Sequence, residues 1–125
     1  ETASALARRC PGGTVGVLAT DGTIQTGLYQ KALEARGLAP WTPPAEIQKE
    51  VMHQIYDRVK KGLPWDRESW VRIEDACRGA GCAAVVLACT ELSVIKADQG
   101  LADWYVDPME VLARKVIETA GKTYR

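Results

Sequence analysis

Residues 82–94 read CAAVVLACTELSV, and this stretch decides the fold. Its first seven residues are apolar with no polar alternation, which is typical of a strand buried on both faces of a parallel sheet. The run stops at Ala88, and Cys89, Thr90 and Glu91 follow, where we expect a short helix to begin. The stretch therefore predicts a central strand that ends in a thiol, a hydroxyl and a carboxylate.

A second apolar run ends in the same manner. Residues 15–19 (VGVLA) are rich in Val, and the polar turn TDGT at residues 20–23 breaks them off. Ile24, Leu28 and Leu33 then lie on roughly one face, which predicts a single helix over residues 24–36 that stops at Gly37. Because ligands bind at the carboxyl ends of strands in such sheets, the two polar strand ends are the expected positions of a site.

The remaining elements continue this alternation. They are an irregular or edge strand over residues 38–42, an amphipathic helix of about four turns from Pro44 to Gly62, a helix capped by Asp66, a strand over residues 104–106, and a last helix that starts at Asp107-Pro108 and carries Met109, Leu112, Val116 and Ile117. Alternating strands and helices predict an α/β fold. We expect a flavodoxin-like, three-layer domain with a short, mostly parallel sheet of about four strands.

The bulk composition excludes several classes of function. The chain has 125 residues, which fits one domain over residues 1–125, and 16 basic residues balance 16 acidic ones. Zero net charge gives no reason to expect nucleic acid or an anionic membrane as a partner, and no apolar run approaches the ~20 residues of a membrane span. Four irregularly spaced cysteines and one histidine predict no metal site, and we expect reduced thiols in the cytoplasm.

Cys89 has two interpretations at this stage. At the start of a helix, free backbone N–H groups favour a thiolate, which can act as a nucleophile or a base. Free cysteines are also among the most buried residues, so an inert structural thiol is the alternative. Thr90 and Glu91 either cap the helix or contact a substrate, with the hydroxyl holding a carboxylate and Glu91 accepting from an ammonium group.

The turn after the first strand also has two interpretations. Thr20 and its neighbours offer a hydroxyl and backbone N–H groups to an anion, or they merely cap the next helix. The turn matches neither the Walker loop nor the dinucleotide-binding glycine pattern. Lys60 and Lys61 end the long helix, where cations are usually solvated. His53 is interpreted as a structural residue of that helix.

Four segments, taken together and in order, resemble the aspartate/glutamate racemases. They are VGVLATDGTIQTGLYQKAL (15–33), IYDRVKKG (55–62), VVLACTELSVI (85–95) and VDPMEVLARKVIETA (106–120). The third resembles the family's strand that ends in G-C-T-E-L, with Ala88 in place of the glycine. The resemblance covers nearly the whole chain.

This resemblance implies a cofactor-independent isomerase that racemises an acidic amino acid without pyridoxal phosphate. It makes Cys89 the second of two catalytic cysteines, which face each other across the substrate's α-carbon. It makes Thr20, Lys60, Thr90 and Glu91 substrate-binding residues, with Lys60 facing a substrate carboxylate. Such enzymes have two similar α/β domains with the site between them.

The family's first cysteine lies in a C-N-T motif that this sequence lacks. The chain therefore resembles the second, C-terminal half of a two-domain racemase, and the N-terminal domain is absent from it. Racemisation needs a base on one face of the α-carbon and an acid on the other. We therefore expect this chain alone to be inactive as a racemase, and we expect it to form a homodimer because apolar surface is uncovered.

Two other functions remain open. The resemblance extends to maleate isomerases and hydantoin racemases, which share this superfamily's fold and also use cysteines at these strand ends. Glu91 favours an amino-acid substrate over theirs, because a carboxylate suits an ammonium group. A non-catalytic module that binds an amino acid or dicarboxylate is the alternative from a different class, and the missing C-N-T motif favours it.

Overall fold

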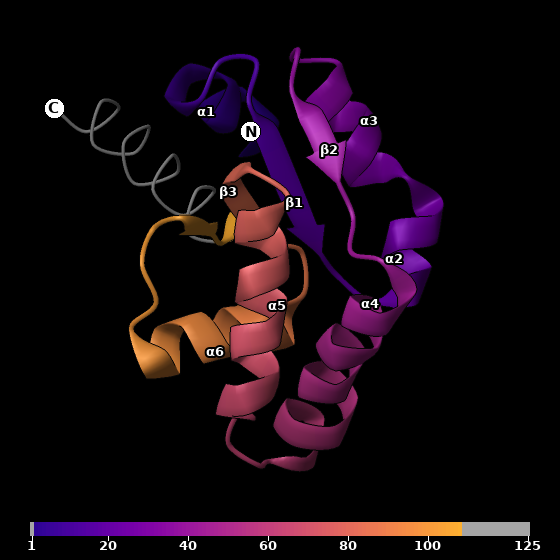
Figure 1. Ribbon diagram of the computed structural model, residues 1–125, viewed down its shortest axis with the longest axis vertical. Helices are drawn as coiled ribbons and strands as arrows, with labels where there is room; N and C mark the ends of the chain where they lie inside the picture. The colour runs from indigo at the N-terminus through magenta and orange to yellow at the C-terminus, as the bar shows by residue number, and fades with distance from the viewer. Residues whose placement is uncertain (1, 109–125) are drawn as a thin grey trace, which may run out of the picture.

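Four parallel strands form the sheet at the centre of the molecule (Figure 1). They are β1 (Thr14–Leu18), β2 (Ala39–Trp41), β3 (Cys82–Leu87) and β4 (Tyr105–Val106), and their order across the sheet is β2-β1-β3-β4. The structure is a computed structural model that describes residues 2–108. The sheet confirms the predicted α/β class, with β1 and β3 as its two central strands.

Side chains of β3 alternate between two hydrophobic clusters, one on each face of the sheet. Val85 and Leu87 belong to the first cluster, and Ala84 and Val86 belong to the second. All four side chains are at most 1% exposed. A strand buried on both faces has no need of polar alternation, and this explains the uninterrupted apolar run that the sequence carries.

Helices cover both faces of the sheet and complete three layers. The first cluster is covered by α4 (Ala45–Met52), α5 (Arg67–Gly79) and α6 (Thr90–Gln99); the second by α1 (Thr2–Arg9), α2 (Asp21–Thr26) and α3 (Leu28–Glu34). Two short segments, the π-helical η1 (His53–Arg58) and the 3-10 segment η2 (Val59–Lys61), lie between α4 and α5. The predicted helix at Asp107-Pro108 falls largely outside the described residues.

The single helix predicted for residues 24–36 is wrong. The chain forms α2 and α3 instead, and Gly27 between them has a φ of 70°. Glycine adopts this left-handed conformation without steric cost, so the helix ends and restarts there. As a result Leu28 is 67% exposed, whereas Leu33 is buried as predicted.

The long amphipathic helix is confirmed in extent, but its geometry changes near its end. Val51 and Ile55 are fully buried, and Gly62 closes the helix with a φ of 72°. From His53 onward the α-helix widens into the π-helical η1 and then tightens into η2 before Gly62. Such local changes rotate the residues that follow relative to a regular helix, and they are frequent at functional sites.

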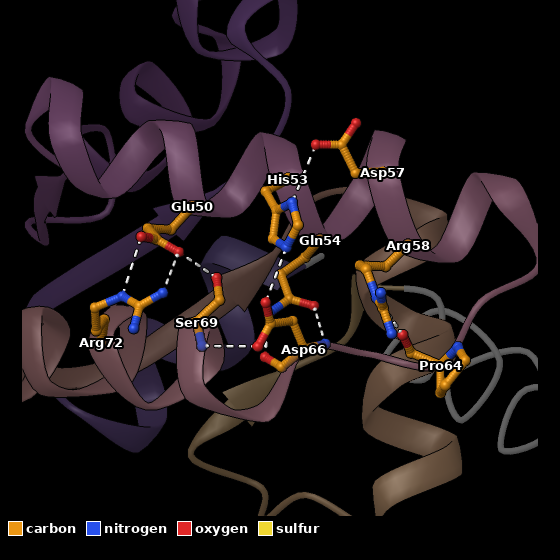
Figure 2. A network of polar contacts seen from close by, with 9 residues as sticks. All are labelled: Glu50, His53, Gln54, Asp57, Arg58, Pro64, Asp66, Ser69 and Arg72. Carbon is orange, nitrogen blue, oxygen red and sulfur yellow. Dashed lines mark hydrogen bonds and ion pairs between the residues drawn. The ribbon is translucent and has the colours of Figure 1, made fainter.

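A network of polar contacts joins this helix to α5 (Figure 2). The buried Gln54 side chain bonds both backbone groups of Asp66, which in turn caps α5 by accepting from the Ser69 N–H. The two ring nitrogens of His53 lie 3.0 Å from carboxylate oxygens of Asp57 and Asp66. A neutral imidazole has one N–H, so two such hydrogen bonds require the protonated ring. His53 thus serves the fold here.

Candidate functional site

The two polar strand ends meet at one edge of the sheet. β1 and β3 are neighbouring parallel strands, with Leu18 paired to Leu87. The Ala88 N–H donates to the Leu18 carbonyl at 2.8 Å, so the ladder continues one step beyond the strands. The chain therefore leaves the sheet at adjacent points, toward Thr20 on one side and Cys89 on the other.

Cys89 stands at the start of α6, as the sequence predicts. Its backbone is extended, with φ −154° and ψ 134°, and α6 begins at the next residue. The N–H groups of Leu92 and Ser93 donate to its carbonyl at 3.1 and 3.2 Å, so the backbone at this position caps the helix. The thiol is half-buried and free of any disulfide.

Three donors converge on the carboxylate of Glu91. Lys60 Nζ lies 2.8 Å from Oε1, and Oε2 accepts from the Cys89 thiol at 3.0 Å and the Thr90 hydroxyl at 2.9 Å. We call Lys60, Cys89, Thr90 and Glu91 the Glu91 cluster. Lys60 first, then the thiol and the hydroxyl, lower the pKa of Glu91 to about 2. Glu91 therefore carries a full negative charge at neutral pH.

The balance of effects on Cys89 differs from the sequence-based expectation. The backbone N–H groups of Glu91 and Leu92 do favour the thiolate, as a helix start should. Burial and the adjacent Glu91 carboxylate outweigh them and raise the pKa of the Cys89 thiol. The sulfur consequently keeps its proton at rest and donates a hydrogen bond to a carboxylate that also accepts from Lys60 and Thr90.

Lys60 reaches the cluster from η2. Its side chain is 43% exposed, and the Glu91 carboxylate raises its pKa. The ammonium group also lies 5.4 Å from the ring centroid of Tyr56, one turn earlier in η1. The sequence predicted that Lys60 would face a substrate carboxylate, and in this structure a protein carboxylate occupies that role.

Thr20 is not part of the Glu91 cluster. Its hydroxyl accepts from the Thr23 N–H at 3.3 Å and donates to the Thr23 hydroxyl at 3.1 Å, so it caps α2. It follows β1, while Cys89 follows the neighbouring β3. The structure thus brings four of the five predicted site residues into direct contact and leaves Thr20 on the adjacent strand end.

Gln48 is a residue of this edge that the sequence did not reveal. From α4 its side-chain amide donates to the Ala19 carbonyl at 2.8 Å and to the Asp21 carboxylate at 3.0 Å. It therefore fixes the chain on both sides of Thr20. A lone glutamine on a helix carries no sequence signal, because the contact depends on how α4 packs beside β1.

A hollow of about 500 Å³ adjoins these residues. It is lined by Asp21, Ala45, Gln48, Lys49, Met52, His53, Tyr56 and Asp57. Asp21 is the first residue of α2 and Tyr56 contacts Lys60, but the residues of the Glu91 cluster do not line this hollow. Its volume is within the range of small-molecule sites.

Metal and membrane features complete the description. Within residues 2–108, the structure contains no group of three or more His, Cys, Asp or Glu side chains arranged to hold a metal ion. Within the same residues, no helix has the length and apolar character that crossing a membrane requires.

Comparison with known proteins identifies the family. The family described as Asp/Glu/Hydantoin racemase matches residues 1–116. The chain belongs to this family. It is also 30% identical, over 106 residues, to an uncharacterized protein in the pnlA 3′ region of Pectobacterium carotovorum subsp. carotovorum; the match covers 83% of this chain and 71% of that protein. The resemblance drawn from the four sequence motifs is thereby confirmed.

Solved structures of racemase-family proteins have the same fold. An aspartate racemase homologue from Pyrococcus horikoshii OT3 matches with a TM-score of 0.77 and 28% identity, over 95% of this chain and 53% of that one. The aspartate racemase of Picrophilus torridus matches with a TM-score of 0.63 and 25% identity, over 96% of this chain and 50% of that one. The chain therefore spans about half the length of these relatives.

Proposed function

We propose that the Glu91 cluster is one wall of a racemase site for an acidic amino acid. In this proposal Cys89 removes and returns the α-proton on one face of the substrate, and no cofactor takes part. Glu91 accepts from the substrate ammonium group, Lys60 binds a carboxylate, and the hydroxyls of Thr20 and Thr90 complete the binding. The observation that carries the proposal is the contact of a thiol, a carboxylate and an ammonium group at one strand end.

The opposite face of the substrate needs a second acid, and the other cysteines of this chain are poorly placed for it. Cys10 precedes β1 and Cys82 begins β3, so both lie toward the amino ends of the strands, away from Cys89. Cys77 is buried within α5, and burial raises its pKa to about 12. We propose that the second cysteine belongs to a further α/β domain, as in a two-domain racemase.

The proposal also concerns assembly and location. We propose that the protein associates as a homodimer through exposed apolar surface. A catalytic thiol must stay reduced, so we place the protein in the cytoplasm. Analytical ultracentrifugation over a range of concentrations tests the first point, and a monomer at every concentration would contradict it.

Two measurements on the 125-residue chain test the chemistry. Chiral chromatography should detect no inversion of aspartate or glutamate, because one thiol serves one face only. Proton NMR in D₂O should detect slow loss of the α-proton signal from one enantiomer, with configuration retained. Cys89→Ala should abolish this exchange, while Cys10→Ala should leave it unchanged. Robust inversion would refute the half-site, and absence of exchange with either enantiomer would refute the catalytic role of Cys89.

A binding module is the second candidate, and it is favoured by the position of the Cys89 thiol, where burial and the hydrogen bond to Glu91 raise its pKa. A sensor binds its ligand without ionising a thiol, whereas a half-site lacks one wall and binds weakly. Isothermal calorimetry with L- and D-aspartate distinguishes the two. Tight binding of one enantiomer without any α-proton exchange would favour the sensor.

The Asp/Glu/Hydantoin family description leaves the substrate class open as well. Hydantoins and maleate carry no ammonium group, so neither would use the charge of Glu91 as an amino acid does. Exchange of the α-proton in aspartate, but not in a hydantoin, is the outcome expected from the Glu91 cluster.

A further inference from the structure

The contacts of Glu91 bear on how the proposed racemase site is regulated, and the inference that follows rests on that proposed function. One carboxylate accepts from Lys60, Cys89 and Thr90 at distances between 2.8 and 3.0 Å. Two of these donors are groups that a substrate would need: the thiol that moves its proton and the ammonium group that binds its carboxylate. In the absence of substrate, the Cys89 thiol and the Lys60 ammonium group are therefore both bound to the Glu91 carboxylate.

We propose that Glu91 keeps Cys89 protonated at rest, and that the ammonium group of an amino acid, by pairing with Glu91 in place of Lys60 and the thiol, frees Cys89 to ionise. The substrate thus switches on the thiol that acts on it. Lys60, displaced from Glu91, becomes available to the substrate carboxylate. The proton that Cys89 loses passes to water, and the bound ammonium compensates the charge of the thiolate.

Glu91 is too weak a base to take the Cys89 proton itself. Its pKa is about 2, whereas burial and the carboxylate raise that of the thiol above the ordinary value of about 8.5. The proton in the hydrogen bond between them therefore stays on sulfur. A carboxylate that accepts from a thiol without removing its proton stabilises the neutral form of that thiol.

The charges that face Cys89 come from two elements. Glu91 on α6 opposes ionisation, and Lys60 on η2 favours it, since the Cys89 thiolate would itself raise the pKa of Lys60. At rest the two charges are paired with each other at 2.8 Å. A substrate ammonium group that pairs with Glu91 replaces this internal pair with external ones, so the carboxylate no longer accepts from the thiol and no longer stabilises its neutral form.

The pH dependence of Cys89 alkylation tests this switch without any need for turnover. The thiolate reacts with iodoacetamide, so the rate against pH from about pH 6 to 10 gives the midpoint of ionisation. Mass spectrometry of the peptides separates Cys89 from the half-buried Cys10, whose rate serves as an internal reference in every sample. Circular dichroism checks that each variant is folded.

Variants on the two sides of the pair should move the midpoint in opposite directions. Glu91→Gln should lower it by about one pH unit, because the opposing charge is removed and Lys60 remains. Lys60→Met should raise the midpoint by about half a unit, because Lys60 no longer offsets the Glu91 charge that opposes ionisation of the thiol. Lys61→Met and Asp98→Asn, on the same two elements, should leave it unchanged. A higher midpoint in Glu91→Gln, or equal shifts in both variants, would overturn the proposal.

Ligands test whether an ammonium group operates the switch. Added L- or D-aspartate should lower the midpoint of wild-type Cys89, while succinate, which lacks the ammonium group, should not lower it at equal ionic strength. Equal effects of aspartate and succinate, or no effect of either, would overturn the ammonium-driven switch. The α-proton exchange described above is measured separately, so loss of exchange with a normal switch would count against the proposed function alone.

Discussion

Two carboxylates of this chain each accept from several donors, yet they serve different ends. Glu50 on α4 receives Arg72 through two nitrogens, at 3.0 and 3.1 Å, and the hydroxyl of Ser69 (Figure 2). Glu91 on α6 receives Lys60 at a single oxygen and two hydrogen bonds from its immediate neighbours. The first set joins two helices, and the second gathers reactive groups at a strand end.

The difference lies in how easily the donors can leave. Arg72 grips Glu50 with a planar, two-point contact, and Ser69 is fully buried beneath it. Lys60 offers a flexible chain and one point charge, and its side chain is 43% exposed. Glu50 therefore holds a permanent contact of the fold, whereas Glu91 holds contacts that a charged ligand can exchange.

Removing Glu50 should have the largest effect on folding. Glu50→Ala leaves the buried Ser69 hydroxyl without its charged acceptor, so the free energy of unfolding should fall by about 2 kcal/mol. Urea denaturation followed by circular dichroism measures it. Glu46→Ala, at an exposed position of the same helix, is the matched control and should change stability little. A Glu50→Ala chain as stable as the wild type would remove the contrast between the two carboxylates.

Glu91→Gln should affect chemistry instead of folding. Loss of the charge that pairs with the substrate ammonium should slow α-proton exchange of aspartate at least about tenfold, which corresponds to roughly 1.4 kcal/mol of binding and transition-state energy. The exchange should slow even though the thiol becomes easier to alkylate. NMR in D₂O measures the rate, and the urea midpoint should stay near that of the wild type. Unchanged exchange would exclude Glu91 from the site.

The sequence predicted the strand end at Cys89, Thr90 and Glu91, but not the contact between Glu91 and Lys60. Cys89, Thr90 and Glu91 are adjacent, and the apolar run before them sets their position at a strand end. The contact of Glu91 with Lys60 depends on the π-helical turn of η1, which alters the phase of the helix and leaves no pattern in the sequence. Helical periodicity alone could not predict it.

Two turns, at Gly27 and at Asp66, were predicted with different success. Gly27 is a possible helix end, but the apolar spacing of Leu28 and Leu33 predicted a helix that continues through it. Asp66 was identified as a helix cap, since capping depends on residues three positions apart. Its further contacts with His53 and Gln54 join separate helices, and only the packed structure reveals them.

His53 should make the fold network sensitive to pH. Asp57 first, and then Asp66, raise the pKa of His53 above its ordinary value of about 6.5. A histidine whose pKa is raised by folding stabilises fully below the unfolded pKa, and this stabilisation is lost as pH rises through the folded pKa. The melting temperature should therefore fall by about 2 °C across that interval, since the ring is partly exposed.

The control for this pH effect is His53→Gln, which cannot carry a charge. Differential scanning fluorimetry should show that the melting temperature of this variant depends less on pH than that of the wild type, from about pH 6 upward. Glu91, whose pKa is lowered to about 2, contributes in the opposite range: its stabilisation is lost only as pH falls toward that value. A wild-type slope that persists in His53→Gln would assign the pH dependence to other groups.

Exchanging the two cations gives the smallest and sharpest test of the comparison. Arg72→Lys replaces a two-point contact with one, and the melting temperature should fall by about 1 °C because the pair is on the surface. Lys60→Arg does the reverse at Glu91, where a guanidinium can bind both oxygens and resist displacement. This variant should slow α-proton exchange about threefold while leaving the melting temperature unchanged or slightly higher. If Lys60→Arg exchanged faster than the wild type, the ease of displacing Lys60 would not limit substrate binding, and the distinction between a fixed and an exchangeable carboxylate would fail.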